Sequence, residues 1–205
     1  MLNKNQRIMK KLFLTLICLF AVCVSYAQTD NAVAERHLKF KGIPIDGTPS
    51  EFGTKLKEAG FFYVEIIDGT RWYNGPFAGY NNCDVAVKAN NNLVYEVVVI
   101  FPKDYSWSQL YNTYSSLKDM LSTKYGKPEF KEAFENTPSY KDINDDNVKY
   151  SEVSYGRCSY WSSFISLVDG LGIIALEIKD SCRVGLHYTD YYNVKKKESA
   201  AINDL

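Results

Sequence analysis

The chain has 205 residues, and its 24 lysine and arginine residues balance 24 aspartate and glutamate residues. Such a composition lacks the basic excess of nucleic-acid-binding domains, so we expect no nucleic-acid partner. The length suits one or two small domains with hydrophobic cores. The 15% of aromatic residues suits sheets and interfaces, where a tyrosine ring packs while its hydroxyl stays wet.

Residues 1–27 have the three parts of a secretory signal peptide: a basic start, an apolar stretch over 12–24, and a cleavage site at Ser25-Tyr26-Ala27. The basic residues are Lys4, Arg7, Lys10 and Lys11. We expect an exported protein, periplasmic or extracellular. The apolar stretch is shorter than the about 20 residues of a membrane span, so no span should remain after cleavage. Cleavage would leave 20 basic against 24 acidic residues. The alternative is an uncleaved signal anchor.

The next segment, residues 28–102, predicts one helix followed by four antiparallel strands. Thr48, Pro49 and Glu51 form a helix start with a capping box, and Gly60 ends the helix. Asp68-Gly69 is typical of a two-residue hairpin turn. The predicted strands are Phe61–Ile67, Thr70–Phe77, Cys83–Ala89 and Leu93–Phe101.

Residues 103–192 repeat this order. Ser106 to Gln109 starts a helix with an apolar stripe, and Gly126 with Pro128 ends it. We interpret residues 129–147 as an irregular acidic loop, and Asp169-Gly170 as a second hairpin turn. The predicted strands are Val148–Tyr155, Cys158–Leu167, Leu171–Ile178 and Arg183–Thr189. Residues 193–205 read as a polar tail that frays.

The sequence therefore predicts an α+β fold of two tandem units, each with one helix and a four-stranded antiparallel meander. We expect the helices on one face of the sheet. The alternative is that the recurrence is coincidence, because Asp-Gly turns and Ser or Thr caps are common.

This organisation resembles that of the secreted tandem-repeat β-lactamase inhibitor proteins, and a single unit resembles the SmpA/OmlA-type lipoproteins. The stretch from His37 to Thr48, together with Phe77-Ala-Gly-Tyr80 and Lys124-Tyr-Gly-Lys-Pro128, also resembles uncharacterised secreted proteins of gut Gram-negative bacteria. The resemblance implies an architecture and no activity, because no inhibitory residue maps onto this chain.

No catalytic or cofactor motif stands out, so we predict a protein that is not an enzyme and has no cofactor. The chain has only two histidines, His37 and His187, and neither the histidines nor the cysteines have the spacing of zinc ligands. Asp142-x-Asn144-x-Asp146 matches the start of a calcium loop, but Asn147 and Val153 stand where glycine and glutamate are needed. A solvated acidic loop is the alternative to a calcium site.

Three cysteines follow the predicted cleavage site. If Asp169-Gly170 is a two-residue turn, partner residue numbers sum to 339, which places Cys158 opposite Ser181 and next to Cys182. We predict a Cys158–Cys182 disulfide, which an oxidising compartment permits, and a free thiol at Cys83. The alternative is three reduced cysteines packed as small apolar groups.

Helices on one face of a sheet leave the other face open to a partner. The residues predicted on this binding face are Tyr63, Glu65, Glu96, Tyr160, Phe164, Glu177, Arg183 and His187. Exposed aromatic and arginine residues suit partner recognition. The alternative is that the tail or the acidic loop covers the face.

We therefore predict a secreted, non-enzymatic module that binds a protein or peptide through an open sheet face. One alternative is a glycan-binding protein that stacks sugars on Trp72, Tyr73, Tyr80 or Trp161. Another is an envelope hydrolase with an unrecognised site.

Overall fold

The computed structural model describes residues 36–134, 143–165 and 171–203. Residue contacts divide the chain into two units, residues 1–36 and 37–205, and all elements named below belong to the second. This unit is an α+β fold built on an antiparallel sheet of eight strands.

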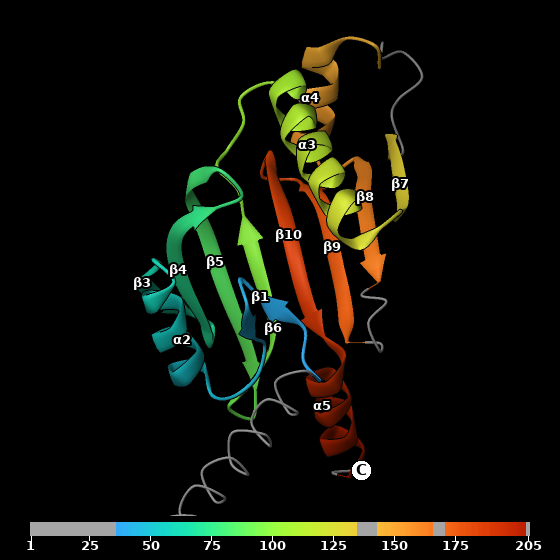
Figure 1. The fold of residues 1–205 in the computed structure, drawn as a ribbon. Helices are drawn as coiled ribbons and strands as arrows, with labels where there is room; N and C mark the ends of the chain where they lie inside the picture. The colour runs from blue at the N-terminus through green and yellow to red at the C-terminus, as the bar shows by residue number, and fades with distance from the viewer. Residues whose placement is uncertain (1–35, 135–142, 166–170, 204–205) are drawn as a thin grey trace, which may run out of the picture. The chain divides into compact units, whose positions relative to one another are not determined.

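The strands follow one another across the sheet in an order with a single jump. The order is β3 (Phe62–Ile67), β4 (Thr70–Phe77), β5 (Tyr80–Asn90), β6 (Leu93–Ile100), β10 (Arg183–Asp190), β9 (Gly172–Lys179), β8 (Cys158–Ile165) and β7 (Glu129–Phe134). The jump is in the middle, where β6 pairs with β10 (Figure 1). β1 (Lys39–Phe40) and β2 (Ile43–Pro44) form a separate two-stranded hairpin.

The two predicted helices are confirmed, and their predicted caps explain where they begin. α2 (Pro49–Glu58) starts at Thr48, whose hydroxyl accepts from the backbone N–H of Glu51 while the Glu51 side chain accepts from Thr48. α3 (Trp107–Tyr125) starts at Ser106, which accepts from the N–H of Gln109. These bonds satisfy backbone donors that a helix leaves without partners in its first turn.

The strand register shows that α2 and α3 lie on the same face of the sheet, which we call the covered face. One row of partners crosses six strands: Tyr73, Val85, Val99, Leu186, Leu176 and Ser162. At one end of this row the Tyr73 hydroxyl reaches Gly53 of α2. At the other end Ser162 Oγ lies 2.6 Å from the hydroxyl of Tyr114 on α3. Figure 1 views the sheet from this side.

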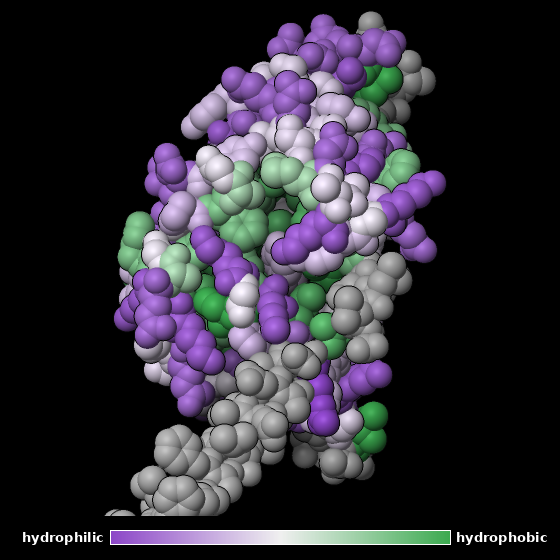
Figure 2. Space-filling model, viewed as in Figure 1, coloured by the Kyte–Doolittle hydropathy of each residue, from purple (hydrophilic) through white to green (hydrophobic). Residues whose placement is uncertain are grey.

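The β1–β2 hairpin also packs on the covered face. The ring of Phe40 stacks on Phe77, with 5.3 Å between ring centroids, and meets Tyr188 edge-on at 5.4 Å. Figure 2 shows apolar residues between the two helices, over the middle of the sheet and surrounded by hydrophilic ones. The core of the unit therefore lies between this face and its coverings.

The next row of partners points to the opposite side, which we call the open face. Its members are Glu65, Trp72, Ala86, Val98, His187, Ala175 and Ser163. Because side chains alternate along a strand, none of these residues shares a face with the row that meets α2 and α3.

Two predictions for the segment before β8 were wrong. The predicted strand Val148–Tyr155 is instead α4 (Asp146–Ser154), because Asp145 caps it by accepting from the N–H groups of Asn147 and Val148. The predicted loop 129–147 begins with β7, which pairs along its length with β8. Residues 135–142 of that loop lie outside the described residues.

The predicted fraying tail is also corrected, since α5 (Tyr191–Asn203) continues directly from β10. Asp190 starts this helix by accepting from the N–H of Asn193 at 2.9 Å. The same carboxylate accepts from the N–H of Leu38 at 2.8 Å and lies 3.2 Å from His37 Nδ1. Asp190 and His37 are both buried, so this cluster ties the start of the unit to α5.

The predicted Cys158–Cys182 disulfide is not formed in the structure. Trp161 pairs with Glu177, so partner numbers sum to 338 and not to 339, and this register places Cys158 opposite Asp180, two residues from Cys182. Cys182 is a buried thiol whose Sγ lies 3.2 Å from Ser154 Oγ. The hairpin turn at Asp169-Gly170 lies outside the described residues.

Candidate functional site

Five charged side chains form a row of ion pairs on the open face, from β5 to β9, which we call the charge ladder. Lys88 Nζ lies 2.9 Å from Glu96 Oε2, and Lys179 Nζ lies 2.6 Å from Glu177 Oε1. His187 stands between the two carboxylates, with Nδ1 2.8 Å from Glu96 and Nε2 3.0 Å from Glu177. Charges therefore alternate along the ladder, and each carboxylate has two donors.

The ladder shifts the protonation of its three central groups. The hydrogen bond from His187 lowers the pKa of Glu177 to about 2, against the opposing effect of burial. Burial alone would raise the pKa of Glu96, but hydrogen bonds from His187 and Lys88 outweigh it and lower that pKa. Burial would likewise lower the pKa of His187, but its bonds to Glu177 and Glu96 raise it. Both ring nitrogens can donate only in the imidazolium form, so geometry and pKa favour a charged His187.

A second polar group on the open face is centred on Arg183. Its Nη2 lies 2.7 Å from Asp84 Oδ2, and its Nε donates to the carbonyl of Phe101 at 2.6 Å. Asn74 donates to the other oxygen of Asp84 at 2.8 Å. Arg183 on β10 is thus joined across β6 to β5, and through Asp84 to β4.

The structure places five of the eight predicted binding-face residues on the open face. Glu96, Glu177 and His187 meet in the ladder, and Arg183 lies beside it on the same strand as His187. Glu65 is on the same face but at the edge, opposite Trp72.

The other three predicted residues, Tyr63, Tyr160 and Phe164, are on the covered face, which corrects the prediction. Tyr63 pairs with Tyr73 and meets its ring edge-on at 5.8 Å. Tyr160 packs edge-on against Trp107 of α3 at 5.2 Å, and Phe164 is buried. Alternation separates Tyr160 and Phe164 from Trp161, but only the contact with α3 decides which set faces inward.

Two of the four candidate sugar platforms are on the open face. Trp161 is 38% exposed and pairs with Glu177, while Trp72 is half-buried nearer the edge. Tyr73 is buried, and Tyr80 packs edge-on against Phe101 at 5.1 Å on the covered side.

The exposure of β3, the edge strand beside the open face, was not predicted from the sequence. All six of its residues are exposed, and five are large apolar residues between 42% and 60% exposed: Phe62, Tyr63, Val64, Ile66 and Ile67. A nearly continuous apolar run is usually typical of a strand buried on both sides, so it predicts the opposite. Only the first place of this strand in the meander hinted that it forms an edge.

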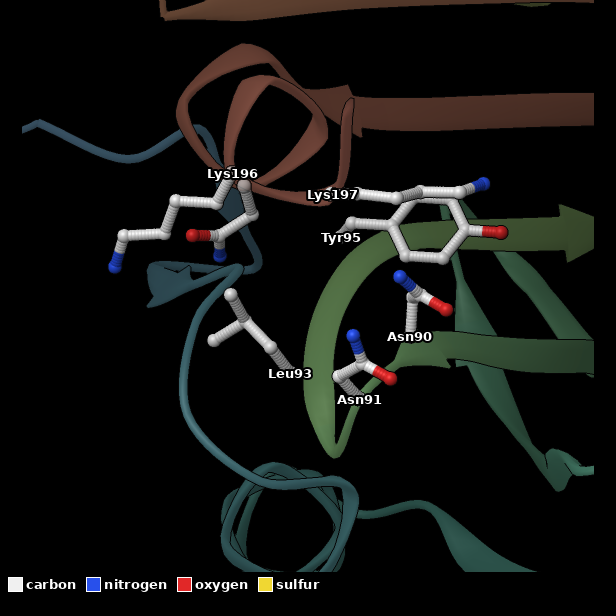
Figure 3. A pocket seen from close by; sticks show the side chains of 7 residues that line it. Asn90, Asn91, Leu93, Tyr95, Lys196 and Lys197 are labelled. Carbon is white, nitrogen blue, oxygen red and sulfur yellow. The ribbon is translucent and has the colours of Figure 1, made fainter. Parts of the chain in front are cut away.

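A small cavity of about 160 Å³ lies between the β5–β6 turn and α5. Figure 3 shows Lys197 extended along the ring of Tyr95, at 4.6 Å from the ring centroid, while Lys196 turns the other way. Asn90 and Asn91 of the turn lie near the same ring (Figure 3). Both lysines are exposed.

The described residues contain no group of three His, Cys, Asp or Glu side chains arranged to hold a metal ion. Asp145 caps α4 and Asp146 lies 3.2 Å from Lys149, which gives both carboxylates roles in the helix. Asp142 of the predicted calcium loop lies outside the described residues. In the part of the chain that the structure describes, no helix has the length and apolar character needed to cross a membrane.

The comparisons with known proteins add no family. No family model matches the chain, and neither the curated proteins nor the solved structures gave a match. Any function must therefore be argued from the open face and its surroundings.

Proposed function

We propose that the protein is an exported, non-enzymatic binding module that takes up a protein or peptide partner on the open sheet face and its β3 edge. The observation that carries this proposal is β3 itself, an edge strand that exposes five large apolar residues. Folded proteins usually protect such edges with charges, proline or a covering segment. β3 carries one charge, Glu65, and a bulge between Tyr63 and Glu65, but its other five residues are apolar and exposed. Such an edge suits an extended peptide, which can add to the sheet through main-chain hydrogen bonds.

The open face next to β3 would supply specificity for such a partner. Glu65 and Ile67 point to the open face and alternate with residues of β3 that point to the covered side, so a strand added outside β3 would place half of its side chains on the open face, beside Glu65 and Ile67. The ladder presents both signs of charge, which favours a partner with complementary charges and disfavours others.

The state of His187 supports a binding role over catalysis. An imidazolium that donates to two carboxylates has no free nitrogen to act as a general base. Acid catalysis would need a substrate to displace one of these carboxylates.

We also propose that the unit is a tandem structural repeat, with an architecture similar to the β-lactamase inhibitor proteins. Its support is the order of elements: α2 precedes the neighbouring strands β3 to β6, and α3 precedes the neighbouring strands β7 to β10. α4 interrupts the second set between β7 and β8 and has no counterpart in the first.

The test is affinity capture from the native cell envelope with the mature protein and two variants. Ile67→Lys places a charge on β3, and Met120→Lys makes the same type of change at a side chain of α3 that is 49% exposed. We expect one partner to be recovered with the unchanged protein and with Met120→Lys, and to be lost with Ile67→Lys. With purified proteins, the partner should bind Ile67→Lys at least tenfold more weakly than Met120→Lys, a difference of about 1.4 kcal/mol in binding free energy.

Recovery of the same proteins with all three baits would contradict the β3 proposal. Self-association that disappears in Ile67→Lys would show that β3 pairs with a second copy of the chain. The export proposal is checked by the mass of the purified protein, which should begin at Gln28.

The exposure of Trp161 beside Glu177 favours glycan binding as a second candidate, because sugars stack on aromatic rings and hydrogen-bond to nearby carboxylates. A glycan array with the unchanged protein and Trp161→Ala tests it. Binding that Trp161→Ala abolishes would support glycan recognition, and an array without hits would exclude it.

A further inference from the structure

A second cavity, of about 220 Å³, lies between α2 and the strands β3 and β4. The helix contributes Ser50, Gly53, Thr54 and Lys57, which are spaced three and four residues apart and so share one side of α2. The strands contribute Tyr63, Arg71 and Tyr73. This cavity is on the covered side of the sheet, away from the charge ladder.

The inner wall of the cavity is the side chain of Tyr73, which is only 1% exposed. Its hydroxyl approaches the backbone of α2 so closely that a Cβ atom on Gly53 would lie 2.0 Å from it. Position 53 therefore has to be glycine for the hydroxyl to sit there. Burial raises the pKa of Tyr73, against the opposing effect of Arg71, so the hydroxyl keeps its proton.

Arg71 lines the same cavity as Tyr73 and opposes the rise in the pKa of its hydroxyl. A guanidinium can only donate hydrogen bonds, so Arg71 does not take up the O–H of Tyr73, which remains able to donate. Arg71 and Lys57 add further N–H donors to the same cavity. None of the residues that line the cavity is acidic.

Within the described residues, no carboxylate is paired with the positive charges of this cavity. Arg157 pairs with Glu152, and Arg183 pairs with Asp84. In the described part of the chain, by contrast, neither Arg71 nor Lys57 makes an ion pair with a carboxylate. A half-buried arginine that lines a cavity, with no acidic residue in the lining, is typical of an anion site.

We propose that this cavity binds the oxyanion group of a small ligand, a carboxylate, sulfate or phosphate. Arg71 donates two in-plane N–H groups of its guanidinium to two of the oxygens, Tyr73 donates its O–H, and Lys57 supplies the second positive charge. The ring of Tyr63 is 42% exposed and stands at the mouth of the cavity, where it can contact the body of a ligand such as a sugar ring.

The test is a titration followed by amide NMR and calorimetry, at constant ionic strength with chloride as the replaced anion. The probes are inorganic sulfate, inorganic phosphate, glucuronate and N-acetylglucosamine 6-sulfate. We expect saturable shifts at the amides of Gly53 and Thr54, with dissociation constants on the order of 1 mM for the inorganic ions. A sugar acid or sugar sulfate that binds about tenfold tighter identifies a sugar-borne oxyanion, and equal affinities identify a free inorganic anion.

Three variants decide whether the named residues form the site. Arg71→Met and Tyr73→Phe should each weaken binding about tenfold, because each removes a hydrogen bond to a charged group. Tyr73→Phe keeps the ring, so folding is preserved. Lys55→Met is the control: it also removes one positive charge, but from a residue of α2 that does not line the cavity, and it should change the affinity less than twofold.

Absence of saturation with all four probes would overturn the proposal. So would equal losses in Arg71→Met and Lys55→Met, which would indicate only a general charge effect. Ile67→Lys should leave anion binding unchanged, so failure at β3 and failure at this cavity can be told apart.

Discussion

The two faces of the central sheet satisfy their polar groups in different ways. On the covered face Ser162 is fully buried, and its Oγ lies 2.6 Å from the hydroxyl of Tyr114 on α3. On the open face His187 is 21% exposed and bonds to charged neighbours on adjacent strands. The covered face therefore determines stability through packing across layers, whereas the open face holds charges within one layer that a partner or a change of pH can alter.

The largest difference between the faces should come from Phe164→Ala. Phe164 is buried on the covered face, so its removal leaves a cavity, and we expect a loss of about 3–5 kcal/mol in the free energy of unfolding. Urea denaturation measures it. Phe130→Ala on β7, where the ring is 52% exposed, is the control and should cost about 1 kcal/mol or less. Equal losses would show that β8 does not turn this face inward.

The next effect concerns the buried hydrogen bond between α3 and β8. Tyr114→Phe leaves the ring in place but removes the 2.6 Å bond to Ser162, so a buried hydroxyl loses its partner. We expect a loss of about 1–3 kcal/mol. The double variant with Ser162→Ala should recover part of this loss, because both polar groups are then gone. Additive losses would contradict a direct bond between the two.

Local signals predicted much of the covered face. The caps at Thr48 and Ser106 and the turn at Asp68-Gly69 depend only on near neighbours, and the structure has all three. The predictions that were wrong concern segments whose structure depends on contacts between distant parts of the chain. The residues of α4 alternate well enough to read as a strand, and only the cap at Asp145 indicated a helix.

The charge ladder was predictable in part. Alternation placed Glu96, Glu177 and His187 on one face, but their contact depends on the pairing of β6 with β10. That pairing joins segments about 90 residues apart, and the sequence alone gives no register for it. The cavity at Arg71 was missed for the same reason, because it needs α2 to be placed on β3 and β4.

On the open face we expect Arg183→Lys to lower the free energy of unfolding by about 1 kcal/mol. Lysine keeps the charge near Asp84 but cannot also donate to the carbonyl of Phe101 from a planar fork. Denaturation at low and high salt separates the two contributions. The loss should persist in high salt, because the bond to a carbonyl is screened less than an ion pair. A loss that vanishes in salt would mean that Arg183 acts only through its charge.

The smallest effect should be the most specific, and it depends on pH. The raised pKa of His187 means that its contribution is complete below pH 6.5 and is lost as pH rises through the raised value. Glu177, whose pKa is lowered to about 2, contributes fully above pH 4.5 and loses its contribution as pH falls toward 2. The ladder should therefore stabilise the fold most between these limits.

His187→Gln tests this window, because glutamine is uncharged at every pH. The free energy of unfolding of the unchanged protein should exceed that of the variant most at about pH 5.5, and the difference should shrink at about pH 9. Glu177 is 37% exposed, so solvent screens the ladder and we expect a difference of about 1 kcal/mol or less. A difference that grows toward alkaline pH would mean that His187 is neutral in the folded protein. The open face would then carry one positive charge less between Glu96 and Glu177, and its preference would shift toward basic peptides.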